Sequence, residues 1–567
     1  MDGRWRVLSA DPEAISHLCR NLSISPLLAR ALINRGLGER EAGDFLNPSL
    51  SQLPSPMLLK DMDKALGRII RAIQRREGIA IYGDYDVDGL TSTALLLLFL
   101  SHFGVRPLHH IPNRLEEGYG LNAKAIRRLK GEGAELIITV DCGVSNIREV
   151  ALAKELGMDV IIIDHHEMSD QVPQALAILN PKREGCPFPY KGLASCGITF
   201  NLLAALRAGL KSDSPNLKRL LYLVALGTVA DVMPLLGANR VMVKYGLEQL
   251  SGAPSVGIEA LKEVSHLKGG QLNSGSVGFI LAPRLNAAGR LGDATPSLRL
   301  LITEDASEAR RLALELDAKN SLRQRLVEET LEEARALVSR DRWVLVVSKE
   351  GWHPGVIGVV AARLMEEFCR PAIVIALSHG LGRGSARSIP AFHIHKGLAN
   401  CAHLLKGFGG HAMAGGLVIE EEKVAEFSDT LEDLARRVLS PQDLAPHLHI
   451  DGLIRFGQLG VEAVAELERL KPHGPGNPEP LFASEGVELL SPVQRIGMGG
   501  EHLKLKLRQD GVILEGIAFD MGYPPPIRPQ GGQTLSLVYT PQLDRWEGHQ
   551  KIQLKIRDMA FGPAPIV

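Results

Sequence analysis

The chain has 567 residues, and its 64 Lys and Arg against 65 Asp and Glu give a formal net charge of −1. This balance excludes a protein that binds nucleic acid through a generally cationic surface, so any such surface must be local. The length predicts roughly three or four domains. Residue usage, 45% hydrophobic and 23% charged, is that of ordinary globular proteins.

The cysteines are scattered and form no Cys-x-x-Cys pair, which argues against a zinc finger and against a disulfide framework. They are Cys19, Cys142, Cys186, Cys196, Cys369 and Cys401. No apolar segment follows the N-terminal residues 1–6, so we expect no signal peptide. The apolar run at 220–232 is too short and too interrupted to span a bilayer. We therefore expect a cytoplasmic protein.

Residues 1–60 are predicted to form small helices with a packing role. Pro26 follows Ser25 at the start of one helix, and Gly36 ends it. The proline-containing residues 44–56 are typical of a linker.

Residues 61–300 alternate helical and strand patterns. A predicted helix at 62–75 precedes a strand at 79–82, and further strands are predicted at 136–140 and 160–163. These strands are continuous apolar runs rich in β-branched residues, which is typical of parallel strands covered on both faces. The pattern predicts a doubly wound α/β domain with a parallel sheet.

Polar clusters follow each of these strands. Asp84, Asp86 and Asp88 follow the first, Asp141 the second, and Asp164-His165-His166 the third. In extended chain the alternating aspartates would share one face. Ligands of such sheets bind at the carboxyl ends of the strands, so we expect the three clusters to converge there. For the first stretch alone, an Asp-rich turn that caps the next helix is the alternative.

Asp231, at the end of an apolar segment, is a fourth candidate. Taken alone it is typical of a helix end or a turn, and a lone His after a strand is usually only hydrogen-bonded. The joint pattern favours a cation site, because carboxylates crowded together repel one another unless a cation lies among them. Carboxylates with imidazole suit Mn²⁺ or Mg²⁺, and several shared carboxylates favour two ions.

Two arginines, Arg284 and Arg290, fall in residues 283–293, which are predicted to be a glycine-containing loop that could grip phosphate. Surface salt bridges are the alternative role for both side chains. From about residue 297 a long helical stretch follows, and residues 301–341 are predicted to connect two domains. Asp305 to Glu308 can serve as its capping box.

A second, smaller α/β unit is predicted over residues 342–440. Strands at 343–347 and 372–377 flank residues 351–358, which carry His353 and lead into a helix. The glycine-rich stretches 382–388, with Ser385 and Arg387, and 407–416, with His411, are predicted to be turns that bring backbone N–H groups and side chains to phosphate. Tight turns with positive φ and no ligand are the alternative. Since this unit has few carboxylates, it is predicted to be a substrate clamp facing the metal domain.

Residues 446–567 contain short runs that alternate polar and apolar residues, as half-buried antiparallel strands do. This pattern predicts a small β-barrel of OB type. The candidate contacts for a single nucleic-acid strand are Lys504, Lys506, Arg508, Arg545 and Trp546. A β-domain with solvated charges remains the alternative.

The combined motifs resemble a known family. Asp86-x-Asp88, Asp141, Asp164-His165-His166 and Asp231, in this order, resemble the DHH phosphoesterase superfamily. The later Gly409-Gly410-His411 resembles its DHHA1 domain. The layout is similar to that of the bacterial single-stranded-DNA exonucleases of this superfamily over nearly the full length, and the stretches at 351–358, 382–388 and 474–480 share in the resemblance.

The resemblance implies hydrolysis of single-stranded DNA from the 5′ end to 5′-mononucleotides with Mn²⁺ or Mg²⁺, in DNA repair and recombination. A DNA helicase and a single-strand-binding protein are the implied partners, with no role for a membrane. The implied metal ligands are Asp86, Asp88, Asp141, His165 and Asp231, with Asp84 adjoining them. Asp141 is the natural bridging carboxylate, and His166 would orient the phosphate. The implied holders of the terminal 5′-phosphate are Arg114, Ser385 and Arg387, while Arg284, Arg290, His353 and His411 are further candidates for contact with phosphate or DNA.

Two other functions stay open. One is a DHH phosphoesterase for short oligonucleotides or cyclic dinucleotides, and the C-terminal β-domain speaks against it. The other is a non-catalytic DNA-binding scaffold, and the intact carboxylate set speaks against that.

Overall fold

The structure is a computed structural model. It describes residues 4–168, 171–210, 215–267, 269–521, 532–546 and 549–566. The chain divides into two compact units, Leu50–Leu444 and a second made of Met1–Ser49 with Ala445–Val567. Within the described residues, no helix is long and apolar enough to cross a membrane.

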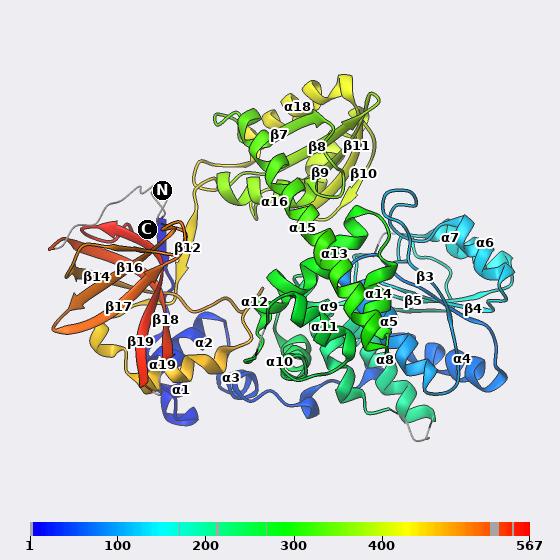
Figure 1. The fold of residues 1–567 in the computed structure, drawn as a ribbon, viewed down its shortest axis with the longest axis horizontal. Coiled ribbons are helices and arrows are strands. Elements are labelled where there is room, and N and C mark those ends of the chain that lie inside the picture. Colours follow the sequence, from blue (N-terminus) through cyan, green and yellow to red (C-terminus); the bar gives the residue numbers. More distant parts are fainter. Residues whose placement is uncertain are drawn as a thin grey trace. The chain divides into compact units, whose positions relative to one another are not determined.

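The larger unit contains a five-stranded parallel sheet with the strand order β3-β2-β4-β5-β6. Its strands are β2 (Ile79–Tyr82), β3 (Leu108–His110), β4 (Leu136–Val140), β5 (Asp159–Ile163) and β6 (Ala177–Leu179). The helices around it are α4 (Met62–Arg75), α5 (Val87–Ser101), α6 (Ala123–Gly131), α7 (Ile147–Glu155) and α8 (Ser195–Leu210). Figure 1 shows α6 and α7 grouped at one side of this sheet.

Both faces of the sheet are covered, as the apolar runs predict. Ile79 and Ile81 join one hydrophobic core with α4, α5 and α8, whereas Ala80 and Tyr82 join another with α6 and α7. Successive side chains of a strand point to opposite faces, so a strand buried on both sides must be apolar throughout. The predicted doubly wound α/β domain is therefore confirmed.

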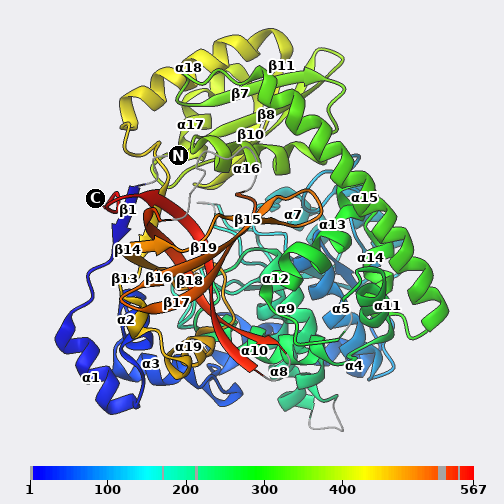
Figure 2. The same ribbon diagram turned by 60° about the vertical axis from the view of Figure 1, so that its left-hand side comes forward.

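A helical region follows the sheet and leads to the long helix α15 (Ala306–Leu337). Its other helices are α9 (Leu221–Ala230), α10 (Gly237–Ser251), α11 (Val256–Val264), α12 (Ser274–Ser276), the π-helix η4 (Val277–Leu281), α13 (Ala282–Leu291) and α14 (Thr295–Ile302). Figure 2 shows α15 running as one continuous helix. Asp305 caps α15 by accepting hydrogen bonds from the N–H groups of Ser307 and Glu308. Glu308 instead pairs with Arg299 and Thr303, so only half of the predicted capping box forms.

The prediction of a loop at residues 283–293 is wrong, because most of this stretch is helix α13. Gly289 lies where a Cβ would approach the carbonyl oxygen of Tyr85 to 2.6 Å. The glycine therefore serves close packing of a helix rather than a turn.

A second sheet of five strands has the order β10-β11-β9-β8-β7, and only β7 and β8 pair in parallel. Its strands are β7 (Leu345–Glu350), β8 (Ala372–Ser378), β9 (Leu381–Arg387), β10 (Leu405–Gly410) and β11 (Ala414–Glu420). Its helices are α16 (Ile357–Phe368), α17 (Ile394–Asn400) and α18 (Val424–Val438). Ile373 and Ile375 of β8 face the core with α17 and α18, and Val374 faces the core with α15 and α16.

The prediction of turns in the glycine-rich stretches 382–388 and 407–416 is wrong, because these stretches are largely strands β9, β10 and β11. A Cβ on Gly382 would lie 2.6 Å from Ile375, and one on Gly384 would lie 2.8 Å from Leu417. These glycines let side chains of neighbouring strands pack over the backbone. The sequence pattern alone does not distinguish glycines in such a strand from glycines in a turn.

The smaller unit combines the N-terminal helices with the C-terminal β-domain. It contains β1 (Arg4–Val7), α1 (Pro12–Leu22), α2 (Pro26–Asn34), α3 (Glu39–Leu46), β12 (His447–Ile450) and α19 (Val461–Leu467). Strand β1, which the sequence pattern does not predict, pairs in parallel with β12. Its Trp5 is fully buried and donates Nε1–H to Asp558 at 2.7 Å.

The β-domain is a seven-stranded sheet with the order β13-β14-β18-β19-β17-β16-β15. Its strands are β13 (Gly452–Leu453), β14 (Phe482–Leu489), β15 (Gln494–Ile496), β16 (His502–Gln509), β17 (Val512–Ala518), β18 (Thr534–Trp546) and β19 (His549–Phe561). An additional pairing of β14 with β16 closes the sheet, and this confirms the predicted small barrel.

Candidate metal centre

The turn between β2 and α5 brings the first carboxylates together. Asp86 caps α5 by accepting hydrogen bonds from the N–H groups of Asp88 and Gly89, at 3.0 and 3.1 Å. Asp88 already lies in the first turn of α5, so the three aspartates do not share one face of an extended segment. A Cβ on Gly89 would come within 2.7 Å of the Asp84 backbone, so only glycine lets the chain fold back this tightly.

The other predicted ligands come to the same place from different elements. Asp141 follows β4 in a left-handed conformation with φ of 63°, and Asp231 caps the C-terminus of α9. His165, after β5, places Nε2 3.4 Å from an oxygen of Asp141 and 3.3 Å from one of Asp231. An oxygen of Asp88 lies 4.0 Å from the same nitrogen. The predicted convergence at the carboxyl end of the sheet is therefore observed.

Ligand atoms gather in three overlapping sets, in each of which all the ligand atoms lie within 4.8 Å of one another. The sets are Asp84-Asp86-Asp141, Asp88-His165-Asp231 and Asp141-His165-His166. Because Asp141 belongs to two of them, its carboxylate would be a ligand shared by two neighbouring cations. This arrangement fits a two-ion site built mainly from oxygen ligands.

The candidate ligands lack the opposite charges and hydrogen-bond donors that would stabilise them, within the part of the chain that the structure describes. Burial, together with the charges of neighbouring aspartates, raises the pKa of Asp84, Asp141 and Asp231 well above the ordinary range and that of Asp88 to about 6. One oxygen of Asp84 and both ring nitrogens of His165 are buried without a hydrogen-bond partner among the described residues. Burial also lowers the pKa of His165 to about 3, so its ring is a neutral ligand. Buried acceptors without donors fit divalent cations.

The N-terminus of α8 fixes two of the carboxylates. The N–H groups of Ser195 and Cys196 donate to the two oxygens of Asp88 at 2.7 and 2.9 Å. The hydroxyl of Ser195 donates to Asp141 at 2.9 Å. These donors hold the carboxylates in place and favour their charged form. Ser195 is not among the predicted site residues, because no local pattern marks a serine at the start of an apolar helix as a support for ligands.

His166 lies beside the ligands and is held by Asp164 and Tyr119. Its Nδ1 lies 2.7 Å from an oxygen of Asp164 and 3.2 Å from the hydroxyl oxygen of Tyr119, and that hydroxyl donates its proton to the carbonyl of Asp141. Although burial opposes the change, the hydrogen bond and charge of Asp164 raise the pKa of His166 to about 9. A protonated His166 that uses Nδ1–H for Asp164 has Nε2–H left to donate to a phosphate oxygen.

A cationic pocket adjoins the carboxylates. A cavity of about 320 Å³ is lined by Asp84, Tyr85, Asp86, Arg114, Tyr119, His166, Ala230, Asp231, Asn286, Gly289, Arg290 and Arg387. Burial, followed by the charges of Arg114, Arg323 and Arg387, lowers the pKa of Arg290 to about 10. Arginines gathered in this way repel one another unless an anion lies among them.

The pocket includes residues from both α/β domains of the larger unit. Ser385 and Arg387 of β9 are joined by a hydrogen bond of 3.2 Å between Nη1 of Arg387 and the serine hydroxyl. A Cβ on Gly358 of α16 would lie 3.0 Å from that hydroxyl and 3.2 Å from the guanidinium of Arg387. The guanidinium of Arg114 lies over the ring of Tyr85, 5.2 Å from its centroid.

The other predicted contacts, Arg284, His353 and His411, do not line this cavity. Arg284 donates to Asp317 and to the carbonyl of Ile280, both at 2.8 Å, and does not line the cavity. Nδ1 of His353 accepts from the N–H of Gly355 near the start of α16. His411 stacks on His166 with ring centroids 6.0 Å apart. Tyr119 and Asn286 line the cavity without having been predicted.

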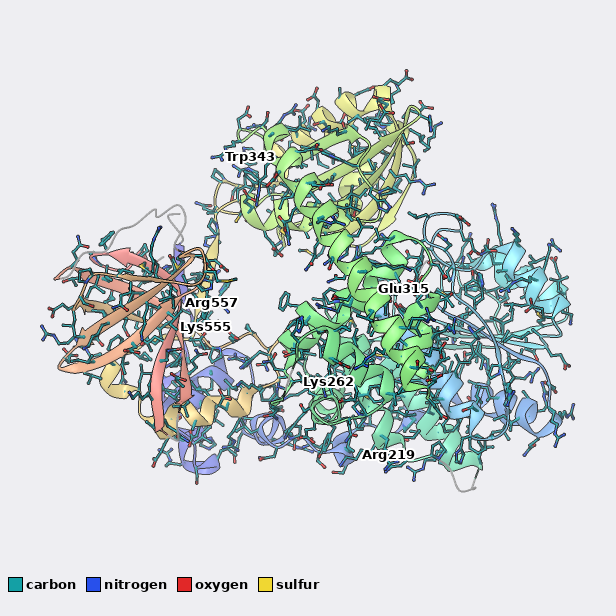
Figure 3. The ribbon with its side chains drawn as sticks, viewed as in Figure 1. Arg219, Lys262, Glu315, Trp343, Lys555 and Arg557 are labelled. Carbon is teal, nitrogen blue, oxygen red and sulfur yellow. The ribbon has the colours of Figure 1, made fainter. Side chains whose placement is uncertain are left out.

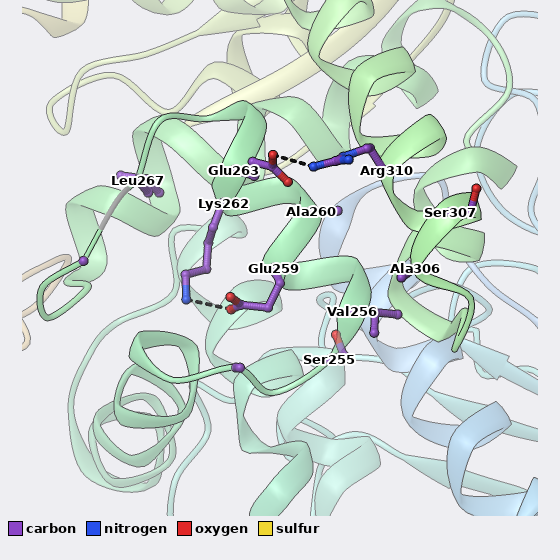
Figure 4. A pocket seen from close by; sticks show the side chains of 12 residues that line it. Ser255, Val256, Glu259, Ala260, Lys262, Glu263, Leu267, Ala306, Ser307 and Arg310 are labelled. Carbon is purple, nitrogen blue, oxygen red and sulfur yellow. Dashed lines mark hydrogen bonds and ion pairs between the residues drawn. The ribbon is translucent and has the colours of Figure 1, made fainter.

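A wider cleft of about 960 Å³ lies between α11 and the start of α15. Figure 4 shows its charged side chains paired, Lys262 with Glu259 and Arg310 with Glu263, each at 2.8 Å. Because the smaller cavity, and not this cleft, adjoins the candidate metal ligands, the smaller cavity is the candidate active site.

On the β-domain, two of the three predicted contacts whose side chains the structure describes are ion-paired. Lys504 pairs with Glu515 at 3.1 Å and Arg508 with Glu488 at 2.7 Å, whereas Lys506 is exposed. The side chains of Arg545 and Trp546 lie outside the described residues. Figure 3 labels two further basic side chains on β19, Lys555 and Arg557, which both pair with Glu479.

Comparison with known proteins places these domains in a family. Residues 78–228 match the model of the DHH family N-terminal domain, residues 341–437 that of the DHHA1 domain, and residues 450–558 that of the RecJ OB domain. The first two matches and the carboxylate site define a DHH phosphoesterase with its DHHA1 domain. The third match and the relatives below are more specific, and the chain belongs to the RecJ family.

The similarity extends over almost the whole chain. The chain is 39% identical over 564 residues to the single-stranded-DNA-specific exonuclease RecJ of Bacillus subtilis, covering 98% of this chain and 71% of that protein. It is 37% identical to RecJ of Escherichia coli, covering 94% of this chain and 95% of that protein. The crystal structure of RecJ from Thermus thermophilus in complex with Mn²⁺ matches with a TM-score of 0.85 and 31% identity, over 99% of this chain and 80% of that chain.

Proposed function

We propose that this protein is a metal-dependent exonuclease that degrades single-stranded DNA from the 5′ end to 5′-mononucleotides. One observation carries the proposal, namely that the cluster of carboxylates borders the same cavity as three arginines that form no ion pair within the described residues. The carboxylates suit cations that activate water, and the arginines suit a terminal phosphate. The names of its RecJ relatives, which are exonucleases specific for single-stranded DNA, support this substrate.

The residues of the site have separate roles in this proposal. Asp84, Asp86, Asp88, Asp141, His165 and Asp231 would hold Mn²⁺ or Mg²⁺. Such ions supply a water of lowered pKa and neutralise charge on the phosphate. His166, protonated and oriented by Asp164, donates a hydrogen bond to a phosphate oxygen at the cleavage point. Arg114, Arg290 and Arg387, with Ser385, hold the terminal phosphate, so that the next phosphodiester lies at the ligands.

These roles account for cleavage from the 5′ end. A pocket that takes a terminal phosphate accepts a chain end and not an internal segment, so the enzyme removes nucleotides from that end. A doubly charged terminal phosphate accepts hydrogen bonds from several charged donors at once, and such charge-assisted hydrogen bonds are stronger than those between neutral groups. The cavity of about 320 Å³ has room for roughly one nucleotide.

The test uses one oligonucleotide with the label at either end. A 5′-phosphorylated strand carrying a 5′ label should release the label at once as a mononucleotide, in the presence of Mn²⁺. The same strand with a 3′ label should shorten stepwise, and a blunt duplex should stay intact. Internal cuts, release of the 3′ label first, or activity only on cyclic or very short substrates would contradict the proposal.

The cellular setting follows from the substrate. Because the enzyme needs a free single strand, a DNA helicase that opens duplex and a protein that binds single strands are the proposed partners in DNA repair and recombination. The proposed compartment is the cytoplasm, where bacterial DNA is processed.

A further inference from the structure

One positively charged side chain at the carboxyl end of the parallel sheet, that of Lys182, has no part in the proposed mechanism. Lys182 lies three residues beyond β6, which is an edge strand of the sheet. Its backbone N–H donates to Asn180 at 2.8 Å, and the buried Asn180 side chain donates to the carbonyl of His166 at 2.9 Å. The loop that carries Lys182 is thus tied directly to the turn that carries the histidines.

The strand order places charged residues in sequence across the carboxyl end of the sheet. Taken in the order β3-β2-β4-β5-β6, the loops after the strands carry Arg114, then Asp84 to Asp88, then Asp141, then His165 and His166, and finally Lys182. Anion-binding residues therefore flank the metal ligands on both sides. A nucleic-acid strand that starts at Arg114 and crosses the ligands reaches Lys182 next, because neighbouring β-strands are only about 4.8 Å apart.

The ammonium group of Lys182 is available for this role. Its partner is Glu167 at 2.8 Å, but the Glu167 side chain is 62% exposed, and such surface pairs are weak. The charge of Lys182 acts on His165, Asp231 and His411, which places it within the electrostatic reach of the site.

We propose that Lys182 binds the phosphate on the 3′ side of the scissile bond, so that the DNA strand crosses the sheet from β3 toward β6. This inference rests on the proposed 5′ polarity, which sets the terminal phosphate at Arg114. Lys182 is then a positioning residue: it contributes to substrate binding at a phosphate that takes no part in the reaction.

Two substrates isolate this phosphate. The dinucleotide pdTdT has a terminal and a scissile phosphate only, whereas pdTdTdT has one more phosphate beyond the scissile bond. Lys182→Ala should raise KM for the first cleavage of pdTdTdT on the order of tenfold with kcat unchanged, as loss of a charge-assisted hydrogen bond predicts. It should leave the cleavage of pdTdT unchanged. On longer strands the slope of log affinity against log salt should become shallower by about 0.7.

Three further variants separate this role from a structural one. Lys182→Arg should retain most of the affinity for pdTdTdT, and Glu167→Gln should not weaken it, because it removes the competing carboxylate. The exposed Lys154→Ala on α7 is the matched control and should behave as wild type on both substrates. Equal effects of Glu167→Gln and Lys182→Ala, or equal effects of Lys182→Ala on the two substrates, would overturn the inference. If wild type fails to release pdT from pdTdTdT, the proposed function itself fails.

Discussion

Nε2 of His165 lies 3.3 Å from a carboxylate oxygen of Asp231, although one residue follows a strand and the other ends a helix. His165 is buried and Asp231 is partly exposed, and neither ring nitrogen of His165 has a hydrogen-bond partner in the described part of the chain. This pair shows why the site should depend on cations, because its neutral imidazole faces a carboxylate whose pKa is raised by burial and by Asp88.

The first prediction concerns Asp231→Asn in the metal-free protein. Removing one of several mutually repelling carboxylates should stabilise the fold, with a rise in Tm on the order of 2 °C at pH 7.5. Mn²⁺ should raise the Tm of wild type more than that of the variant, since the variant has lost a ligand. Thermal melts in chelator and in Mn²⁺ check both effects. A variant less stable than wild type in chelator would contradict the assigned repulsion.

A second prediction is the pH dependence of metal-free stability. The folded-state pKa of Asp88 is about 6, above its unfolded value, and those of Asp84, Asp141 and Asp231 are raised further. The folded state therefore binds more protons than the unfolded state in this range, and the contribution of these groups to stability falls as pH rises through about 4 to 6 and beyond. Mn²⁺ should reverse this trend, because it binds the ionised carboxylates. Chemical denaturation at several pH values measures the free energy of unfolding with and without the ion. A metal-free wild type that gains as much stability over this range as Asp231→Asn would count against the raised pKa values.

The arginine pocket yields a third prediction. Arg387→Ala should lower kcat/KM on 5′-phosphorylated strands on the order of tenfold or more, as loss of a charge-assisted contact does, and should affect 5′-hydroxyl strands much less. Arg284→Ala is the matched control, since Arg284 pairs with Asp317 outside the cavity, and it should change both substrates alike. Mn²⁺ binding by calorimetry should be unchanged in Arg387→Ala. Equal loss on both kinds of end would remove the terminal-phosphate assignment.

The hydroxyl of Tyr119 yields a fourth prediction. Tyr119→Phe removes the hydroxyl that touches both His166 and the carbonyl of Asp141, and it preserves the ring. We expect kcat to fall on the order of tenfold with KM and Mn²⁺ affinity nearly unchanged, because the hydroxyl orients His166 and binds no ion. Steady-state kinetics on a single strand, with Tm as the control for folding, check this. An unchanged kcat would show that Asp164 alone orients His166.

Much of the larger unit can be predicted from the sequence because its signals are local and repeated. The helix at 62–75 and the strand at 136–140 have the predicted bounds, since a strand covered on both faces needs an uninterrupted apolar run. The convergence of Asp141 and His165 follows from the rule that parallel strands end at one edge.

The errors come from contacts that the local pattern does not contain. Gly382 and Gly384 look like turn residues, but they are needed because Ile375 and Leu417 pack over them. Strand β1 is only four residues long, and its pairing with β12 brings together opposite ends of the chain. Ser195 supports Asp88 and Asp141 through contacts that only the folded chain reveals.

In the proposed two-ion site the carboxylate of Asp141 would be shared by both ions, and comparing wild type with Asp141→Ala tests this role most directly. Both proteins are incubated with Mn²⁺ and a 5′-phosphorylated single strand labelled at its 3′ end, after thermal melts establish that the variant is folded. Wild type should shorten the strand stepwise from the 5′ end while the folded variant leaves it intact. A variant that trims the strand as fast as wild type, or a wild type that removes the 3′ label first, would contradict the account.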